Sequence, residues 1–473
     1  MSAPDDTQAQ PVRLAFYGDD FTGSTDALEV LAFAGLACAL FLKPPTPTML
    51  QRFGQLDAIG LAGDSRGMTP QEMDASLPEL LQALSKLAPI IHYKVCSTFD
   101  SSPAIGSIGR VIEIARKCIS NGTVPVVAGN PALGRFCLFG NLFAKSGTDG
   151  RIYRIDRHPI MSVHPVTPMD EADLGLHLAR QAPLAISKFA FTEFDKHRES
   201  IDETLATLMR EPSDAMLFDA STPDHLTEIG RLLDAQARRQ NPLFVVGSSG
   251  VEYALTQWWK EAGLPTQPTS GFDFFPGVDR VLAVSGSASK LTAMQIESAV
   301  EAGFAEVPVS ARQLVDDAHW QKARDEVAAR VADHLAAGRS VIVHTARGPH
   351  DPRIEEMIDA LAAQGMSRAE AKHEGGRTLA VRLGHVVQDI LAHVPVRRVL
   401  LSGGDTSSQV TQVLAPDALT IAARLAPGAP LCRMHSSAKA LDGIEVALKG
   451  GQMGDVHFFD RARRGTHFDK ETI

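Results

Sequence analysis

The sequence predicts an α/β protein of two domains, each with a largely parallel or mixed sheet. Short apolar runs that are typical of buried strands are repeatedly followed by a glycine-containing turn and a helical pattern. At 473 residues the chain is longer than one comfortable hydrophobic core. A stretch rich in proline, glycine and aromatic residues at 263–277 separates two such series. We therefore expect one domain at 1–265 and another at 278–473.

Composition narrows the functional classes. The chain has 44% hydrophobic and 22% charged residues, as ordinary soluble globular proteins do. A net charge of −10 argues against nucleic acid or an anionic membrane as partner. The 5 cysteines never form a Cys-x-x-Cys pair, which argues against a disulfide framework or a zinc knot. Residues 1–10 lack the order of a signal peptide and no run of about 18 apolar residues occurs, so we expect a cytoplasmic protein.

Two adjacent carboxylates stand at the end of the first expected strand, 12–17. The motif at 18–24 (GDDFTGS) leads into a helix whose apolar face is Ala27, Val30, Leu31 and Ala34. Open α/β sheets bind ligands at such strand ends. Asp19 or Asp20 could accept the proton of a substrate hydroxyl, while the other binds metal or orients a sugar hydroxyl. Alternatively one of them caps the helix, but capping needs one carboxylate and not two.

Polar residues also follow the expected strands at 58–62 and 90–95. Arg66 follows the first and is a candidate clamp for a carboxylate, although it could equally form a surface salt bridge. Lys94, Ser97 and Thr98 bring a cation and two hydroxyls to the same edge. Between them stands Cys96, which we interpret as a packing residue because no histidine partner can be inferred.

The rest of the first half contains strand patterns at 124–128, 184–187, 215–219 and 243–246. The loop at 129–135 (GNPALGR) is another polar strand-end loop. Residues 149–168 read as irregular, and the His-Pro pairs there favour a rigid loop or lid over a metal site. Residues 247–250 resemble a nucleophile elbow, but the second glycine arrives one residue early, which disfavours a hydrolase serine.

The second half has its clearest signal at 399–414. A strand at 399–401 runs into a tight loop, and a helix is expected to start with Thr406 or Ser407 as its N-cap. Gly403 and Gly404 allow close approach of a ligand, and a helix N-terminus suits phosphate. Asp405 cannot bind that anion directly, but could hold a metal on the phosphates or a ribose hydroxyl. The alternative is a turn that only connects two elements.

Two further turns have the same character. Ser285 and Ser287 follow a strand at 280–284. A strand at 444–449 ends at Lys449 and runs into Gly450 and Gly451. A long helical pattern covers 311–337. Neither a Walker pattern nor a G-x-G-x-x-G after a strand occurs, so phosphate binding here requires several loops to converge.

Taken in order, these motifs resemble the four-carbon acid sugar kinase family over nearly the whole chain. They are the segments 18–24, 93–98, 164–169, 285–287, 403–406 and 449–454. The resemblance implies a sugar acid on the first domain, ATP on the second, and an active site in the cleft between the domains. Asp19, Arg66, Lys94 and Ser97 would face the acid. Ser287, residues 403–406 and Gly450 would contact ATP, with Mg²⁺ bridging the phosphates.

The resemblance implies an ATP-dependent kinase for 3-oxo-tetronate, threonate, erythronate or a branched acid such as 3-oxo-isoapionate. Cys96 stands where the family commonly has aspartate, and residues 99–102 (FDSS) replace its usual Leu-Arg-Gly. These departures change the charge pattern of the acid pocket and favour a less common acid. A two-lobed sensor without turnover is the alternative, and a nicotinamide-dependent dehydrogenase ranks last because its glycine fingerprint is missing. A homodimer is possible.

Overall fold

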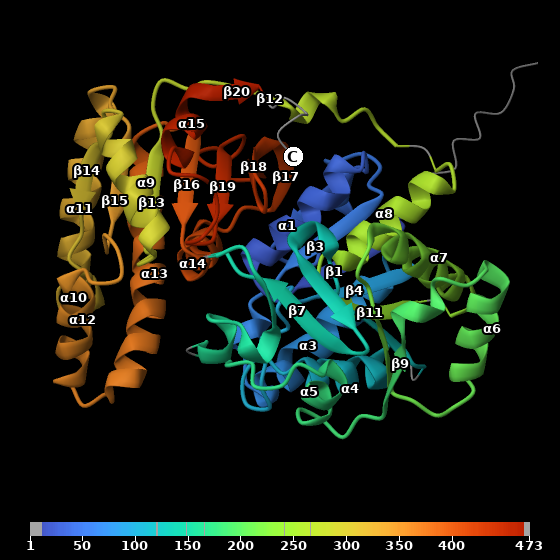
Figure 1. Ribbon diagram of the computed structural model, residues 1–473. Helices are drawn as coiled ribbons and strands as arrows, with labels where there is room; N and C mark the ends of the chain where they lie inside the picture. The colour runs from blue at the N-terminus through green and yellow to red at the C-terminus, as the bar shows by residue number, and fades with distance from the viewer. Residues whose placement is uncertain are drawn as a thin grey trace, which may run out of the picture. The chain divides into compact units, whose positions relative to one another are not determined.

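The computed structural model describes residues 12–119, 122–147, 149–164, 166–240, 242–264 and 266–467. The chain divides into two compact units, residues 1–267 and 268–473, each built on its own run of parallel strands (Figure 1). The segment at 1–10 and Pro165 of the second His-Pro pair lie outside the described residues. No described helix combines the length and the apolar character needed to cross a bilayer.

The first unit has a parallel sheet. Its strands follow the spatial order β2 (Cys38–Phe41), β3 (Ala58–Ala62), β1 (Leu14–Gly18), β4 (Ile90–Lys94), β11 (Leu243–Gly247), β5 (Val124–Val127), β10 (Ala215–Phe218) and β9 (Ile186–Phe189). Most of these strands are buried along their whole length, which explains their continuous apolar sequences.

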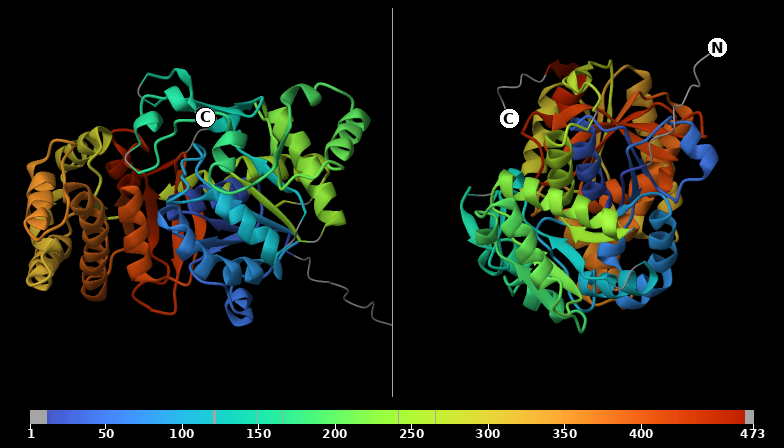
Figure 2. Two further views of the ribbon diagram at one scale, coloured as in Figure 1. Left: turned by 90° about the horizontal axis from the view of Figure 1, so that it is seen from below. Right: turned by 90° about the vertical axis from the view of Figure 1, so that its right-hand side faces the viewer.

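Helices cover both faces of this sheet (Figures 1 and 2). One layer contains α1 (Phe21–Phe33), α7 (Pro223–Arg239) and α8 (Gly250–Glu261), and the other contains α3 (Pro70–Ser85), α4 (Ile108–Cys118) and α5 (Leu174–Ala179). The described part of this unit also contains α2 (Pro47–Gln51) and α6 (Arg198–Leu208). The expected strands and helices of the first half are thus present in the described residues.

The first unit also contains a small antiparallel sheet, which the sequence patterns do not predict. It consists of β6 (Arg135–Leu138), β7 (Asn141–Lys145) and β8 (Ile152–Arg154). The prediction of an irregular stretch at 149–168 was therefore wrong for its first residues. β8 is mostly exposed, so its three residues lack the apolar pattern of a buried strand.

The second unit has a mixed sheet. Five parallel strands come first, β14 (Ala305–Pro308), β15 (Val341–His344), β13 (Leu282–Ser285), β16 (Arg398–Ser402) and β19 (Glu445–Lys449). Two antiparallel strands complete it, β18 (Ala429–His435) and β17 (Ala418–Ala426). A separate ribbon pairs β12 (Phe274–Pro276) with β20 (Gly465–His467).

The helices of the second unit form two groups. In one, α9 (Lys290–Glu301) packs against α15 (Phe458–Arg464); the other contains α10 (Ala311–Val315), α11 (Trp320–Ala336), α12 (Pro352–Ala362), α13 (Arg368–His393) and α14 (Gly404–Leu414). The single helical pattern predicted at 311–337 is wrong, because it is two helices separated at 316–319. Asp316 explains the break, since its side chain accepts the N–H of Ala318 in a turn.

The helix α14 begins earlier than the sequence predicts. Its N-cap is Gly403, not Thr406 or Ser407. Gly403 has a φ of 112°, a left-handed value that a residue with a side chain rarely adopts, and this lets the helix start directly after β16. The N–H groups of the first helical turn therefore belong to the glycine loop itself.

The fully buried Arg398 ties distant parts of the second unit together. Its Nε donates to Glu445 Oε2 at 2.9 Å, its Nη1 to the Ala462 carbonyl at 2.5 Å and its Nη2 to the Pro276 carbonyl at 3.1 Å. The guanidinium also lies 5.1 Å from the centre of the Phe275 ring. One side chain thus joins two strands of the main sheet to α15 and to β12.

Replacing Arg398 tests this connection. We expect Arg398→Ala to lower the free energy of unfolding of the second unit by about 3–5 kcal/mol, because the buried Glu445 then keeps only the distant Arg397, whose Nη2 lies 4.0 Å from Glu445 Oε1. Arg397→Ala is the comparison, because it removes the long contact with the same carboxylate from a side chain that is 59% exposed, and it should cost about 0.5 kcal/mol or less. Calorimetric unfolding of both variants measures the difference, and equal losses would contradict the role of Arg398.

Candidate functional site

Each unit places polar loops at the point where its strand order reverses. In the first unit the chain runs from β1 to β2 and β3 on one side and then crosses to β4 on the other. In the second unit it runs from β13 to β14 and β15 and then crosses to β16. Open α/β sheets bind ligands at the carboxyl ends of the strands beside such a reversal. Asp19 and Lys94 follow the first pair of strands, and Ser287 and Gly403 follow the second.

In the first unit the structure brings Asp19, Asp20 and Arg66 together. Arg66 donates from Nε and Nη2 to the two oxygens of Asp19, at 3.1 and 2.8 Å. Its Nη1 lies 2.8 Å from Asp20 Oδ2. A guanidinium has five N–H groups, so these three contacts leave two that can bind a ligand. We call Asp19, Asp20, Arg66, Lys94 and Asp26 the charged cluster.

The two adjacent carboxylates have different surroundings. Asp20 is the N-cap of α1, where it accepts the N–H of Gly23 at 2.6 Å and the hydroxyl of Thr22 at 2.9 Å. Burial opposes its ionisation, but Arg66, Lys94 and these hydrogen bonds outweigh burial and lower the pKa of Asp20. Asp19 makes no capping bond, and burial raises its pKa even though Arg66 acts against the shift. The alternative that one carboxylate caps the helix therefore applies to Asp20.

Lys94 is almost fully buried, 3% exposed, at the end of β4. Its Nζ lies 3.4 Å from Asp26 Oδ2. Burial opposes its charge, but Asp26, Asp20 and Asp19 together raise the pKa of Lys94 above its ordinary value. Lys94 therefore remains a cation beside the carboxylates. The sequence analysis missed Asp26, which lies in α1, the helix after the neighbouring strand β1. A buried lysine needs a counter-charge, but only the strand pairing shows that this helix supplies it.

The hydroxyls predicted beside Lys94 occupy a tight loop. Thr98 Oγ1 donates to Asp100 Oδ1 at 2.5 Å and lies 3.0 Å from the Cys96 sulfur. Burial raises the pKa of Cys96 to about 11, so it is a thiol and not a nucleophile at neutral pH. Ser97 is partly exposed in the same loop. Asp100 and Cys96 both act electrostatically on Arg66, which places this loop beside the charged cluster.

In the second unit three glycine loops converge, at 285–289, 402–406 and 449–453. A Cβ added to Gly286 would lie 2.2 Å from Thr406 Oγ1, and one added to Gly451 would lie 2.4 Å from Ser287 Oγ. Both positions therefore require glycine. The backbone N–H of Gly403 donates to the Lys449 carbonyl at 2.9 Å. The loops therefore converge, as the hypothesis of a phosphate site requires.

Hydrogen bonds fix the loops against helix α9. The carbonyl of Gly451 accepts from Ser289 Oγ at 2.5 Å and from Thr292 Oγ1 at 3.0 Å. Gln295 Nε2 donates to the carbonyls of Met453 and Asp455 at 3.0 and 2.8 Å. Sequence reasoning missed these helical side chains, because nothing in an amphipathic helix marks a residue that binds a distant loop.

Lys449 is fully buried where the three glycine loops meet. Its Nζ donates to Ser402 Oγ and to the Gly450 carbonyl, both at 3.0 Å, and lies 5.6 Å from the centre of the Phe458 ring. Burial lowers the pKa of Lys449 to about 7, and no carboxylate in the described part of the chain offsets it. An arriving anion would supply the missing counter-charge.

The three glycine loops offer open backbone and free N–H groups to an anion. Gly404 has open space where a Cβ would stand, and the first turn of α14 offers unbonded N–H groups. Asp405 is the carboxylate of these loops and is exposed, so it could contribute an oxygen to a magnesium ion bound by phosphates and water. Within the described residues no group of three His, Cys, Asp or Glu side chains is arranged to hold a metal by itself.

The histidines of the two His-Pro pairs have local structural roles. His158 Nδ1 accepts the N–H groups of Ile160 and Met161, at 3.2 and 3.3 Å. His164 Nδ1 accepts the N–H of Thr167 at 3.1 Å. Both rings thus stabilise turns, in agreement with the interpretation as a rigid loop.

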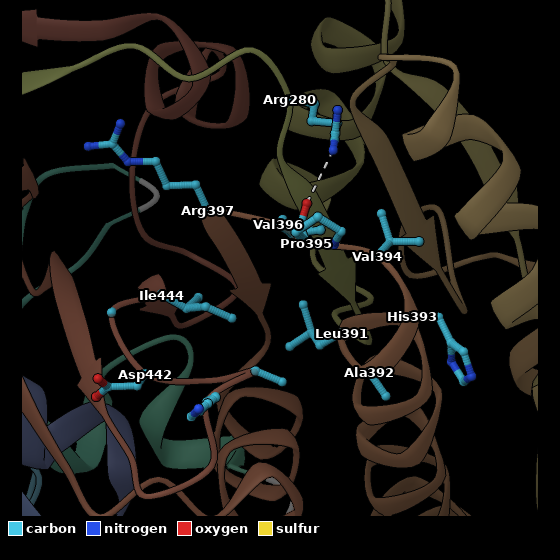
Figure 3. A pocket seen from close by; sticks show the side chains of 13 residues that line it. Arg280, Leu391, Ala392, His393, Val394, Pro395, Val396, Arg397, Asp442 and Ile444 are labelled. Carbon is cyan, nitrogen blue, oxygen red and sulfur yellow. Dashed lines mark hydrogen bonds between the residues drawn. The ribbon is translucent and has the colours of Figure 1, made fainter.

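A cavity of about 550 Å³ lies elsewhere in the second unit. Its lining includes Arg280, Arg397 and Ile444, which precede β13, β16 and β19 (Figure 3). It therefore opens at the amino ends of the strands whose carboxyl ends carry the glycine loops. The Arg280 guanidinium there is held by the Pro395 carbonyl at 3.2 Å. The cavity is separate from the candidate site.

Comparison with known families gives two matches that together span most of the chain. A family model described as a sugar-binding N-terminal domain matches residues 14–255. A model described as a nucleotide-binding C-terminal domain matches residues 282–459. The first contains the charged cluster and the second contains the three glycine loops.

Curated relatives align over nearly their full length. A protein of Paraburkholderia graminis named 3-oxo-isoapionate kinase is 43% identical over 453 residues, 96% of this chain and 94% of the relative. A Cupriavidus necator protein named 3-oxo-tetronate kinase is 29% identical over 97% of this chain and 98% of its own.

Solved structures show the same fold. One from Salmonella typhimurium has a TM-score of 0.73 at 23% identity, over 96% of this chain and 99% of its own. A Haemophilus influenzae protein has a TM-score of 0.67 at 22% identity, over 95% of this chain and 99% of its own.

The depressed pKa of Lys449 predicts a pH-dependent nucleotide affinity. A bound phosphate favours the charged lysine, so binding raises this pKa from about 7. Below pH 7 the lysine is already charged and affinity for ADP is at its full value. Above pH 7 binding must take up a proton, so affinity falls as pH rises towards 9.

Calorimetry checks this linkage. Titration of ADP at pH 8 in two buffers of different ionisation enthalpy should show uptake of a large fraction of one proton. Lys449→Met should bind ADP more weakly below pH 7 and lose the proton uptake. Unchanged uptake in Lys449→Met would show that another group titrates.

Proposed function

We propose the substrate and mechanism of this chain from one premise: it belongs to the four-carbon acid sugar kinase family. The chain is an ATP-dependent kinase that phosphorylates a hydroxyl of a small sugar acid. The observation that carries this proposal is Lys449, a buried lysine without a carboxylate partner where three glycine loops meet. The charged cluster of the first unit supplies the groups that an acceptor hydroxyl needs.

Asp19 is the general base in this proposal. A base takes the proton of the acceptor hydroxyl as its oxygen attacks the γ-phosphorus, and a raised pKa makes Asp19 the better proton acceptor of the two carboxylates. Asp20 caps α1 and holds Arg66. The two remaining N–H groups of Arg66, with Lys94, bind the carboxylate of the acid. Ser97 and Thr98 would contact its hydroxyls.

The second unit binds the triphosphate. The first turn of α14 offers the N–H groups of Gly404, Asp405 and Thr406, while Lys449 adds a positive charge. Ser285, Ser287, Gly450 and Gly451 line the facing loops. Magnesium would neutralise phosphate charge, with Asp405 as the nearby carboxylate. Phosphoryl transfer requires the acceptor oxygen of the acid to lie opposite the leaving oxygen of the γ-phosphoryl group. The expected active site between the units stays a prediction.

The acid is proposed to be branched, of the 3-oxo-isoapionate type. The relative of that name is 43% identical, against 29% for a 3-oxo-tetronate kinase of similar coverage. In the acid loop Thr98 and Asp100 are paired and Cys96 remains a thiol. Cys96 stands where the family pattern has aspartate, and Asp100 lies in the segment that replaces Leu-Arg-Gly, so the pocket differs where it meets the acid.

A panel of acids tests the proposal. ADP release should require both Mg²⁺ and a sugar acid. The value of kcat/KM should be higher for 3-oxo-isoapionate than for 3-oxo-tetronate, threonate or erythronate. Omitting the acid is the control for background hydrolysis. Binding of acids by calorimetry without any ADP release would instead favour the sensor.

Separate substitutions distinguish the two carboxylates. We expect Asp19→Asn to lower kcat by about 10²- to 10⁴-fold, the usual contribution of a general base. Asparagine also caps helices, so we expect Asp20→Asn to lower kcat by less than Asp19→Asn does. A larger loss in Asp20→Asn than in Asp19→Asn, measured by single-turnover phosphorylation, would assign the base to Asp20.

A further inference from the structure

The loop after β5 holds a buried polar pair that the proposed mechanism does not use. Asn130 is fully buried, and its Nδ2 donates to Ser249 Oγ at 3.1 Å. Its Oδ1 has no hydrogen-bond partner. The Nε of Arg135 is likewise buried without a partner. Native proteins rarely leave such groups unsatisfied, because a buried polar atom without a partner loses its hydrogen bonds to water and gains none in return.

The backbone places the two side chains on one face. Asn130 and Arg135 exchange both backbone hydrogen bonds, N to O at 2.9 and 3.0 Å, and form an antiparallel bridge. Residues opposite each other in such a pair point to the same side. This face of the hairpin therefore carries an unpartnered acceptor, Asn130 Oδ1, and an unpartnered donor, Arg135 Nε. A hydroxyl group can donate to the one and accept from the other.

The neighbouring contacts hold this pair in place. Arg135 Nη1 donates to the carbonyls of Leu133 and Lys145, at 3.0 and 3.1 Å, which fixes the guanidinium. A Cβ on Gly250 would lie 2.3 Å from the Gly129 carbonyl, so the loop packs directly against the start of α8. The unpartnered atoms therefore belong to a rigid part of the unit.

The pair stands on the same edge as the charged cluster. Asn130 follows β5, Ser249 follows β11, and β11 is the strand between β5 and β4. Gly247 of β11 pairs with both Lys94 and Val127, so the end of β5 lies roughly 10 Å from Lys94 along the edge, and Asn130 follows three residues later. Burial lowers the pKa of Arg135 and Cys96 acts against that shift, which places the guanidinium within electrostatic reach of the Cys96 loop.

We infer that Asn130 and Arg135 form a subsite for a hydroxyl on the side arm of a branched sugar acid. This inference rests on the proposed function and deepens it. A linear four-carbon acid held by Arg66 and Lys94 extends over the ends of β3, β1 and β4. The hydroxymethyl arm of a branched acid extends towards β11 and β5, where it donates to Asn130 Oδ1 and accepts from Arg135 Nε.

Two variants test the subsite. Asn130→Leu removes the acceptor at similar size, and Arg135→Lys keeps the charge but removes Nε. We expect the ratio of kcat/KM for 3-oxo-isoapionate over 3-oxo-tetronate to fall about 10- to 100-fold in each, mainly through KM. A structural defect would lower both substrates equally, and thermal unfolding of each variant identifies a loss of fold.

The outcomes separate this inference from the proposed function. If the wild-type protein releases no ADP with any acid, the kinase proposal fails. The subsite is then tested by calorimetry, as the ratio of the affinities for the branched and the linear acid in the wild type and in each variant. If wild type prefers the branched acid but both variants keep the ratio, water satisfies the pair and the subsite is wrong. Equal affinity of wild type for the branched and linear acids would overturn it as well.

Discussion

Parallel pairing of neighbouring strands is the constraint on which both candidate sites depend. It brings the carboxyl ends of β1, β3 and β4 to one edge, and those of β13, β16 and β19 to another. Residues far apart in the chain, such as Asp19 and Arg66, meet because each directly follows one of these strands. The reversal of strand order beside β1 and beside β13 then leaves room for a ligand.

The buried cations of the two units differ in whether carboxylates balance their charge. In the first unit Arg66 and Lys94 are matched by three carboxylates, so this site is organised before a ligand arrives. In the second unit the partners of Lys449 among the described residues are neutral, so an anion would supply the counter-charge that it lacks. Preorganised groups suit proton transfer and orientation, whereas an uncompensated cation suits binding of phosphate.

Much of this arrangement could be predicted from the sequence, since buried strands and glycine turns have local signatures. Asp19, Arg66 and Lys94 were predicted because each follows a clear apolar run. The start of α14 was misplaced, because a glycine with positive φ can cap a helix without the hydroxyl that usually marks one. Asp26 and the unpartnered Oδ1 of Asn130 depend on tertiary contacts, which periodicity does not encode.

The tie made by Arg398 has a consequence for biosynthesis. Its acceptors include the Pro276 carbonyl near the start of the second unit and the Ala462 carbonyl close to its end. During synthesis Pro276 precedes Arg398, whereas Glu445 and Ala462 follow it by 47 and 64 residues. The guanidinium therefore cannot complete its contacts, nor the second unit its core, until the segment that contains Ala462 has been made.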